Sequence, residues 1–361
     1  MSNKFAILAA LLTAIFMWAG CKDDNPSEPL PDFKSQLQEH VVHSTALMGN
    51  AFNDPIDRKV MVYTPPGYDP NGEKRYPVVY LLHGLPLSDS TFISPEAWAG
   101  MNEVADFRPE GFTAWIDTLI AQQVIAPMIL VMPETKTLYG FCFYTNSVLQ
   151  GNYEDYITQD LVGYIDANFK TISTRDGRAV IGHSQGGYGA MRMGLLHADV
   201  FSVVASHSGT LYFDGLKAGT PFVIAENPNG MMGPEHGGFM TRVTYGMAAA
   251  WSPNLQNPPY QVDLPFVYPS GQNIPAVWDR WLEHDPYTLL NTHAADLLSL
   301  RGLYLDCGTQ DGWYGLSQFY DQALTSRNIP HTFESFTGTH FNKLISRVEV
   351  SLAYCSAHIQ H

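Results

Sequence analysis

The sequence predicts an α/β protein with a mostly parallel, doubly wound sheet flanked by helices. The chain has 361 residues, of which 45% are hydrophobic, enough to bury a large core. Short apolar runs typical of buried strands alternate with helical patterns over most of its length. Between a strand pattern at 178–181 and a helix pattern at 187–193 stands Gly-His-Ser-Gln-Gly (182–186), which is typical of a sharp strand-to-helix turn.

The N-terminal residues 1–20 are expected to be a lipoprotein-type signal peptide. Lys4 precedes an apolar run that is short for a membrane span, and small residues stand directly before Cys21. The pattern resembles a bacterial lipoprotein signal with Cys21 as the lipidated residue, so we expect an exported protein anchored at the periplasmic or cell-surface side of a membrane. Residues 21–35, polar and rich in Pro, are expected to be a disordered tether. An ordinary signal peptide and an uncleaved anchor remain open.

The remaining residues, 36–361, are expected to form a single domain. Its first clear strand is 76–82, which runs into a loop of His83, Gly84 and Leu85. We expect His83 to hydrogen-bond beneath this loop, and Gly84 to be required by the turn.

The turn at 182–186 predicts a nucleophile. Its geometry lifts the side chain of Ser184 above the sheet edge, and glycines are needed two places either side because a Cβ there would strike backbone. Backbone amides of Gln185 and Leu85 are the expected donors to an oxyanion.

A serine hydroxyl needs a histidine base and an acid that orients it. The strand pattern 301–305 leads to Asp306 and Asp311, and the strand pattern 331–336 leads to His340, which precedes a helix pattern at 341–357. His340 is the expected base, and Asp311 is preferred as the acid because Asp306, close to the strand end, is expected to be held by backbone amides.

An insertion at about 212–285 separates the strand 201–206 from the strand that carries the acid. Its many aromatic residues, Pro and Gly suit a cap-like wall over an irregular apolar cleft. The expected pocket residues are Phe143, Tyr144, Trp251 and Trp313.

The chain resembles the putative esterase family, the esterase D and feruloyl esterase branch of the α/β-hydrolases, which also includes mycolyltransferases. The matching text is Tyr-Leu-Leu-His-Gly (80–84), Phe-Tyr-Thr-Asn (143–146), Gly-Asn-Tyr-Glu-Asp-Tyr (151–156), Asp-Leu (160–161), Gly-His-Ser-Gln-Gly-Gly-Tyr-Gly-Ala (182–190), Asp-Cys-Gly (306–308) with Asp311, and Gly-Thr-His (338–340). The resemblance implies a Ser184, Asp311 and His340 triad. Gln185 stands where Met is common in the family, and the segment 212–285 is longer than in compact members.

The composition argues against several other classes of protein. The net charge of −15 argues against nucleic acid and against electrostatic docking on anionic membranes, so any membrane contact would run through Cys21. No metal-site or nucleotide-loop motif is present, so neither metal nor cofactor is expected. Cys142, Cys307 and Cys355 are expected to be mostly buried free thiols, although one disulfide among the three remains open.

The leading functional hypothesis is a serine carboxylic-ester hydrolase that acts through an acyl-enzyme, with feruloyl or acetyl esters of polysaccharide as the family-based guess for its substrate. An acyltransferase that uses the same triad is the alternative. A catalytically silent carbohydrate-binding protein is disfavoured because the triad and the oxyanion loop would both have to be coincidental. The acyl and alcohol groups and the oligomeric state are not readable from the sequence.

Overall fold

The computed structural model describes residues 33–84, 88–99 and 103–361. The expected signal peptide, Cys21 and most of the expected tether lie outside the described residues. Within the described part of the chain, no helix is both long and apolar enough to cross a membrane.

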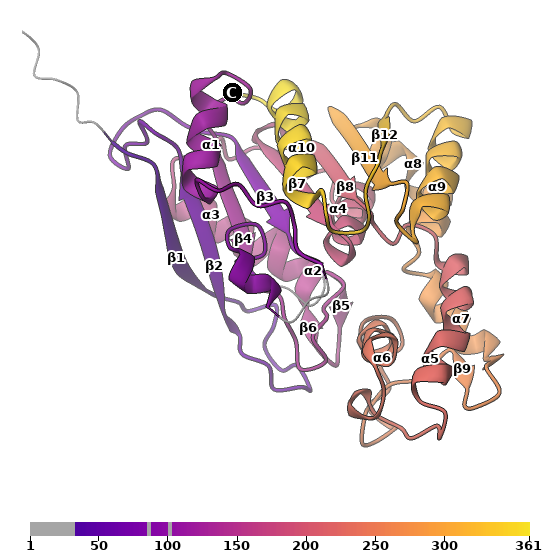
Figure 1. Cartoon of the computed structure of the whole chain (residues 1–361). Helices are drawn as coiled ribbons and strands as arrows, with labels where there is room; N and C mark the ends of the chain where they lie inside the picture. The colour runs from indigo at the N-terminus through magenta and orange to yellow at the C-terminus, as the bar shows by residue number, and fades with distance from the viewer. Residues whose placement is uncertain (1–32, 85–87, 100–102) are drawn as a thin grey trace, which may run out of the picture. The chain divides into compact units, whose positions relative to one another are not determined.

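A mixed sheet of eight strands forms the centre of the fold, in the order β1-β2-β4-β3-β7-β8-β11-β12 (Figure 1). The strands β3, β4, β7, β8, β11 and β12 are parallel, whereas β2 pairs antiparallel with both β1 and β4. The bounds are β1 (Gln36–His43), β2 (Asp57–Thr64), β3 (Val78–Leu82), β4 (Ile129–Pro133), β7 (Arg178–His183), β8 (Val203–His207), β11 (Gly302–Gly308) and β12 (Thr332–Phe336). This arrangement confirms the predicted fold class.

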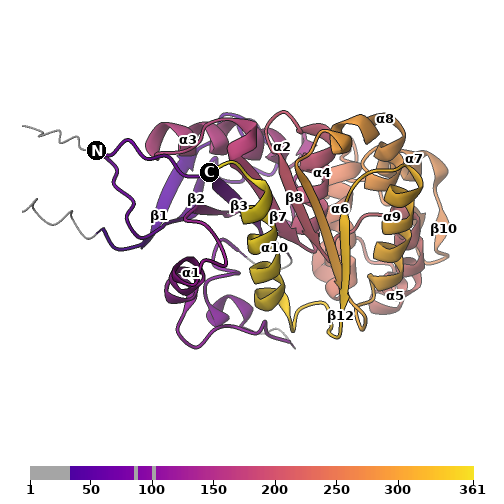
Figure 2. The ribbon, with the colours of Figure 1, turned by 90° about the horizontal axis from the view of Figure 1, so that it is seen from above.

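Helices cover both faces of this sheet. Figure 2 shows α1 (Phe112–Ala121) and α10 (Leu344–His358) on one face, and α3 (Val162–Asn168), α4 (Gln185–Leu196) and α8 (Pro286–Leu298) on the other. A further helix, α9 (Tyr314–Ser326), packs with the core on the α4 side. The sheet is therefore buried on both sides, as expected where crossover helices join parallel strands.

The strand β3 shows how the sequence builds the two cores. Its side chains alternate: Val78, Tyr80 and Leu82 join the core on the α4 side, whereas Val79 and Leu81 join the core on the α10 side. All five side chains are fully buried. A continuous apolar run is what a strand covered on both faces requires.

Residues 212–285 form a separate layer next to the sheet. They contain α5 (Thr220–Glu226), α6 (Phe239–Trp251), the hairpin of β9 (Phe266–Val267) with β10 (Gln272–Asn273), and α7 (Pro275–Leu282). Figure 1 shows α5, α6, α7 and β9 grouped together. The apolar side chains of this layer form one core with Phe141, Phe143 and Leu149, which lie before and within the hairpin of β5 (Asn146–Ser147) and β6 (Gly151–Asn152), and with Tyr188 of α4. The short helix α2 (Tyr153–Asp155) follows β6, and its Tyr153 belongs to the core on the α4 side.

Candidate active site

Ser184 occupies the sharp turn between β7 and α4. Its backbone has φ 58° and ψ −118°, a conformation that non-glycine residues rarely adopt. A Cβ on Gly182 would lie 1.9 Å from the carbonyl oxygen of Gly186, and one on Gly186 would lie 2.0 Å from that of Leu82. Both contacts are far inside van der Waals distance, so the two glycines are steric requirements of the turn, as the sequence predicts.

The loops after β11 and β12 bring Asp311 and His340 together. The two strands are parallel, so their carboxyl ends meet at the edge of the sheet where β7 also ends. His340 Nδ1 donates to Asp311 Oδ2 at 2.7 Å, and the backbone N–H of Trp313 donates to the other carboxylate oxygen at 3.0 Å. Burial alone would raise the pKa of Asp311, but the hydrogen bond and charge of His340 lower it to about 2. Asp311 is therefore an ionised partner for this histidine.

Asp306 lies elsewhere and has other partners. It stands within β11, where it pairs with Glu334 and His207 on the neighbouring strands, and not in the loop after the strand. Its carboxylate accepts from His207 Nδ1 at 2.8 Å and from Arg347 Nε at 2.7 Å. No backbone amide of the described residues donates to this carboxylate, contrary to the sequence expectation. Its position in the sheet interior favours side-chain partners from β8 and α10, and these lower its pKa despite burial.

The loop after β3 carries one of the expected oxyanion donors. Leu85 lies outside the described residues. His83 is buried, its Nδ1 donates to the carbonyl of Gly84 at 2.9 Å, and its Nε2 faces the hydroxyl of Thr135 at 2.9 Å. The expectation that His83 hydrogen-bonds beneath the loop is confirmed.

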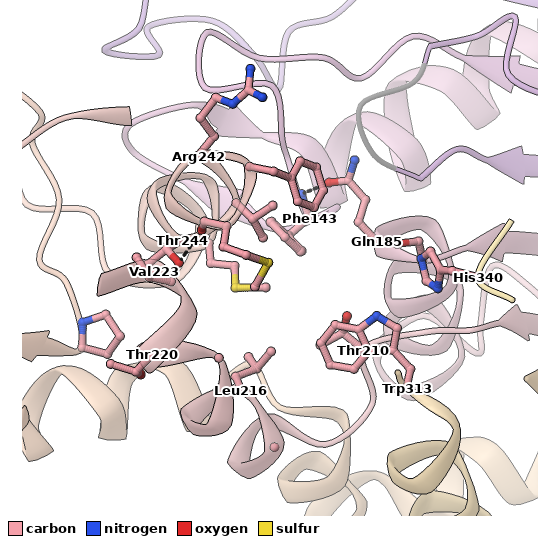
Figure 3. Close-up of a pocket in the computed structure, with 18 of the residues that line it drawn as sticks. Phe143, Gln185, Thr210, Leu216, Thr220, Val223, Arg242, Thr244, Trp313 and His340 are labelled. Atoms are coloured by element: carbon pink, nitrogen blue, oxygen red, sulfur yellow. Dashed lines mark hydrogen bonds between the residues drawn. The ribbon is translucent and has the colours of Figure 1, made fainter. Parts of the chain in front are cut away.

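Gln185, the other expected donor, is the first residue of α4. Its backbone N–H has no carbonyl four residues back within the helix and is thus available at the helix N-terminus. Its side chain makes a contact that the sequence does not predict: Oε1 accepts the backbone N–H of Phe143 at 3.0 Å (Figure 3). Phe143 and Tyr144 both have positive φ angles, 45° and 46°, so this contact anchors a strained loop.

A cavity of about 740 Å³ opens in front of Ser184, Gln185 and His340. Figure 3 shows Phe143, Trp313 and His340 around it, with residues of the 212–285 layer such as Leu216, Val223 and Thr244 opposite. Further apolar side chains line it: Val243, Met247, Phe266, Trp278 and Trp281. Such a volume and lining are typical of sites for small organic ligands.

The sequence prediction is wrong for two of the four expected pocket residues. Tyr144 is fully buried and its hydroxyl donates to the carbonyl of His83 at 2.9 Å, and Trp251 packs against Phe213 and Trp281. Neither lines the cavity. The aromatic residues of these segments predicted an apolar cavity wall. The sequence does not show which of these side chains face the cavity and which pack behind them.

The described residues contain no group of three His, Cys, Asp or Glu side chains placed to hold a metal ion. Cys142, Cys307 and Cys355 are buried free thiols, as expected. Burial raises the pKa of Cys142 and of Cys307 to about 12, which makes both thiols poor nucleophiles.

Comparison with known proteins shows to which family this chain belongs. The sequence profile of the family described as "Putative esterase" matches residues 54–344, most of the chain. The chain belongs to this family. It is 32% identical to the esterase MT1326 of Mycobacterium tuberculosis over 154 residues, which are 42% of this chain and 28% of that protein. The chain thus spans under a third of the length of that curated relative.

Solved structures show the same fold. A ferulic acid esterase superposes with a TM-score of 0.62 at 22% identity, covering 91% of this chain and all of the other. The fluorophosphonate-binding serine hydrolase F of Staphylococcus aureus superposes with a TM-score of 0.59 at 19% identity, covering 90% and 99%. The architecture is that of the α/β-hydrolase esterases.

Proposed function

We propose that this protein hydrolyses carboxylic esters through a triad of Ser184, His340 and Asp311. The observation that carries the proposal is the 2.7 Å hydrogen bond between His340 and Asp311 on the rim of the cavity that also exposes Ser184. Membership of an esterase family supports the same reaction class.

The reaction follows from the groups present. Ser184 Oγ attacks the ester carbonyl carbon while His340 Nε2 takes its proton, and Asp311 stabilises the imidazolium that forms. The backbone N–H groups of Gln185 and Leu85 would bind the oxyanion. The alcohol leaves with the proton from His340, and a water molecule activated by His340 then releases the acid and restores Ser184.

For the substrate we propose an ester of an aromatic acid of hydroxycinnamoyl type. The cavity lining carries Phe143, Phe266, Trp278 and Trp281, whose flat faces suit a planar acyl group. The similarity in fold to a ferulic acid esterase points the same way. A smaller acyl group such as acetyl would leave most of the 740 Å³ unfilled.

We also propose that Cys21 carries a lipid that anchors the enzyme to a membrane after export. The support is the sequence pattern alone: an apolar run, small residues, the cysteine and a polar, Pro-rich segment.

The test is hydrolysis of a panel of p-nitrophenyl and hydroxycinnamoyl esters by the wild type and by Ser184→Ala. Loss of the nucleophile should lower turnover by about 10⁶-fold without loss of fold. A folded Ser184→Ala variant with wild-type turnover would refute the mechanism. Adding an alcohol acceptor to the same assay distinguishes a hydrolase from an acyltransferase. An acyltransferase would form the new ester in preference to the free acid.

A further inference from the structure

His183, the residue before the nucleophile, contacts the base from beneath. Its Nε2 lies 2.7 Å from the backbone carbonyl oxygen of His340, and the centres of the two imidazole rings are 4.7 Å apart. The ring also lies 5.5 Å from that of Phe341. His183 is the last residue of β7 and only 2% exposed, whereas His340 stands in the loop before α10. One buried side chain thus links the end of β7 to the loop before α10, 157 residues away in sequence.

The geometry fixes the protonation state of this histidine. A carbonyl oxygen only accepts, so Nε2 carries the proton and donates it. The other ring nitrogen, Nδ1, is buried and has no hydrogen-bond partner among the described residues. A second proton there would be a buried donor without an acceptor. Burial accordingly lowers the pKa of His183 to about 3, so the ring stays neutral and serves as a fixed donor.

His183 lies between the nucleophile turn, the loop after β3 and the loop that carries His340. The backbone of the next residue, Ser184, is held by the carbonyl of His207 on β8 at 2.9 Å. A Cβ on Gly84 would lie 3.0 Å from His183 Nδ1, so Gly84, which follows β3, lies directly against the ring. The His340 imidazole is held at Nδ1 by Asp311, and its backbone is held by His183.

We propose that His183 is a positioning residue for His340: its Nε2–H donor fixes the backbone of the base relative to the nucleophile. The inference rests on the proposed function, because it concerns the geometry of the same triad. His183 itself stays out of proton transfer, since its donor is committed to a carbonyl and the ring is neutral.

The consequence is a defect in turnover and not in substrate binding. A displacement of the base by about 1 Å costs about 100-fold in rate, whereas the cavity that binds the acyl group is lined by other residues. His183→Leu, similar in size but without a donor, should lower kcat by about 10- to 100-fold and change KM by less than about threefold. His183→Gln, whose Nε2 extends to a similar distance from Cβ, should keep kcat within about threefold of the wild type.

The decisive measurement is a mutant cycle with p-nitrophenyl acetate as the substrate. If His183 acts through His340, then His183→Leu should lower the residual turnover of His340→Ala by less than about twofold. Circular dichroism and thermal melts verify that each variant is folded, and His183→Met replaces the leucine variant if that one does not fold.

Three results would overturn the inference: wild-type kcat in the leucine or methionine variant, no recovery in His183→Gln, or an undiminished loss in the His340→Ala background. The last result would mean that His183 supports the nucleophile turn alone. Failure of the proposed function is a separate outcome, since it would leave Ser184→Ala and His340→Ala as active as the wild type.

Discussion

Replacing Asp311 by Asn should disable the base while leaving the protein folded. Asp311 Oδ2 accepts the Nδ1 proton of His340 at 2.7 Å, which leaves Nε2 free to act as the base. An asparagine amide can instead donate to Nδ1 and so favour the wrong tautomer. A loss of about 10⁴ in turnover is expected from such a change, which corresponds to about 5.5 kcal/mol of barrier.

The same substitution should change how stability depends on pH. The pKa of Asp311 falls from its ordinary value of 3.8 to about 2 in the folded protein. At 1.36 kcal/mol per pKa unit, the difference is worth about 2 kcal/mol. Because the folded pKa is the lower one, this stability is present above about pH 4 and is lost as the pH falls towards about 2. The wild type should lose this contribution on acidification, and Asp311→Asn should not.

Asp306→Asn is the matched control. It removes a carboxylate that pairs with His207 and Arg347 in the sheet interior, so it should cost about 3–5 kcal/mol of stability. The folded protein should retain turnover within about tenfold of the wild type. Steady-state kinetics on a p-nitrophenyl ester and urea unfolding from pH 2 to pH 7 measure both effects. If Asp306→Asn lost 10⁴ in turnover and Asp311→Asn lost little, the acid would be Asp306.

Three further changes test other parts of the account. Gly186→Ala should abolish soluble or active protein because its Cβ would lie 2.0 Å from the carbonyl oxygen of Leu82, whereas Gly315→Ala, which meets nothing within 4 Å in α9, should be tolerated in a thermal melt. Gln185→Met should raise KM for aromatic esters several-fold with little change in kcat, because it frees the loop at Phe143 but keeps the backbone donor; an unchanged KM would contradict this role. Cys21→Ser should move ester hydrolysis from the membrane fraction to the soluble fraction, or leave unprocessed precursor; equal membrane association of both forms would indicate an uncleaved anchor.

The parallel strands that carry the site could be predicted from the sequence because each is a short run of apolar residues, a pattern contained in the strand itself. Continuous apolar runs marked β3, β7, β8 and β11, although β11 continues to Gly308 and so encloses Asp306. The strand β1, at the edge of the sheet, and the strands β2 and β4 beside it were not predicted. In β1 only Val42 is fully buried, so its polar residues give little contrast between a strand and a loop.

The residues of the site could be predicted where both their chemistry and their order along the chain follow the strands. Ser184, Asp311 and His340 each follow a strand, and the expected pairing of Asp311 with His340 agrees with the observed hydrogen bond. The contacts of His183 and of Asp306 join segments far apart in sequence, and no local pattern marks such pairs. Tyr144 is buried in the core on the α4 side and Trp251 in the core of residues 212–285, and a single sequence does not reveal how either core packs.

The central claim, that Ser184 is the nucleophile, is tested most directly by active-site labelling. A fluorophosphonate reacts only with a serine that a base activates. Incubation of the protein with such a probe, followed by digestion and mass spectrometry of the peptides, should show one phosphonate per chain, on Ser184, and none in His340→Ala over the same time. A label on another residue, or none on the folded wild type, would contradict the account.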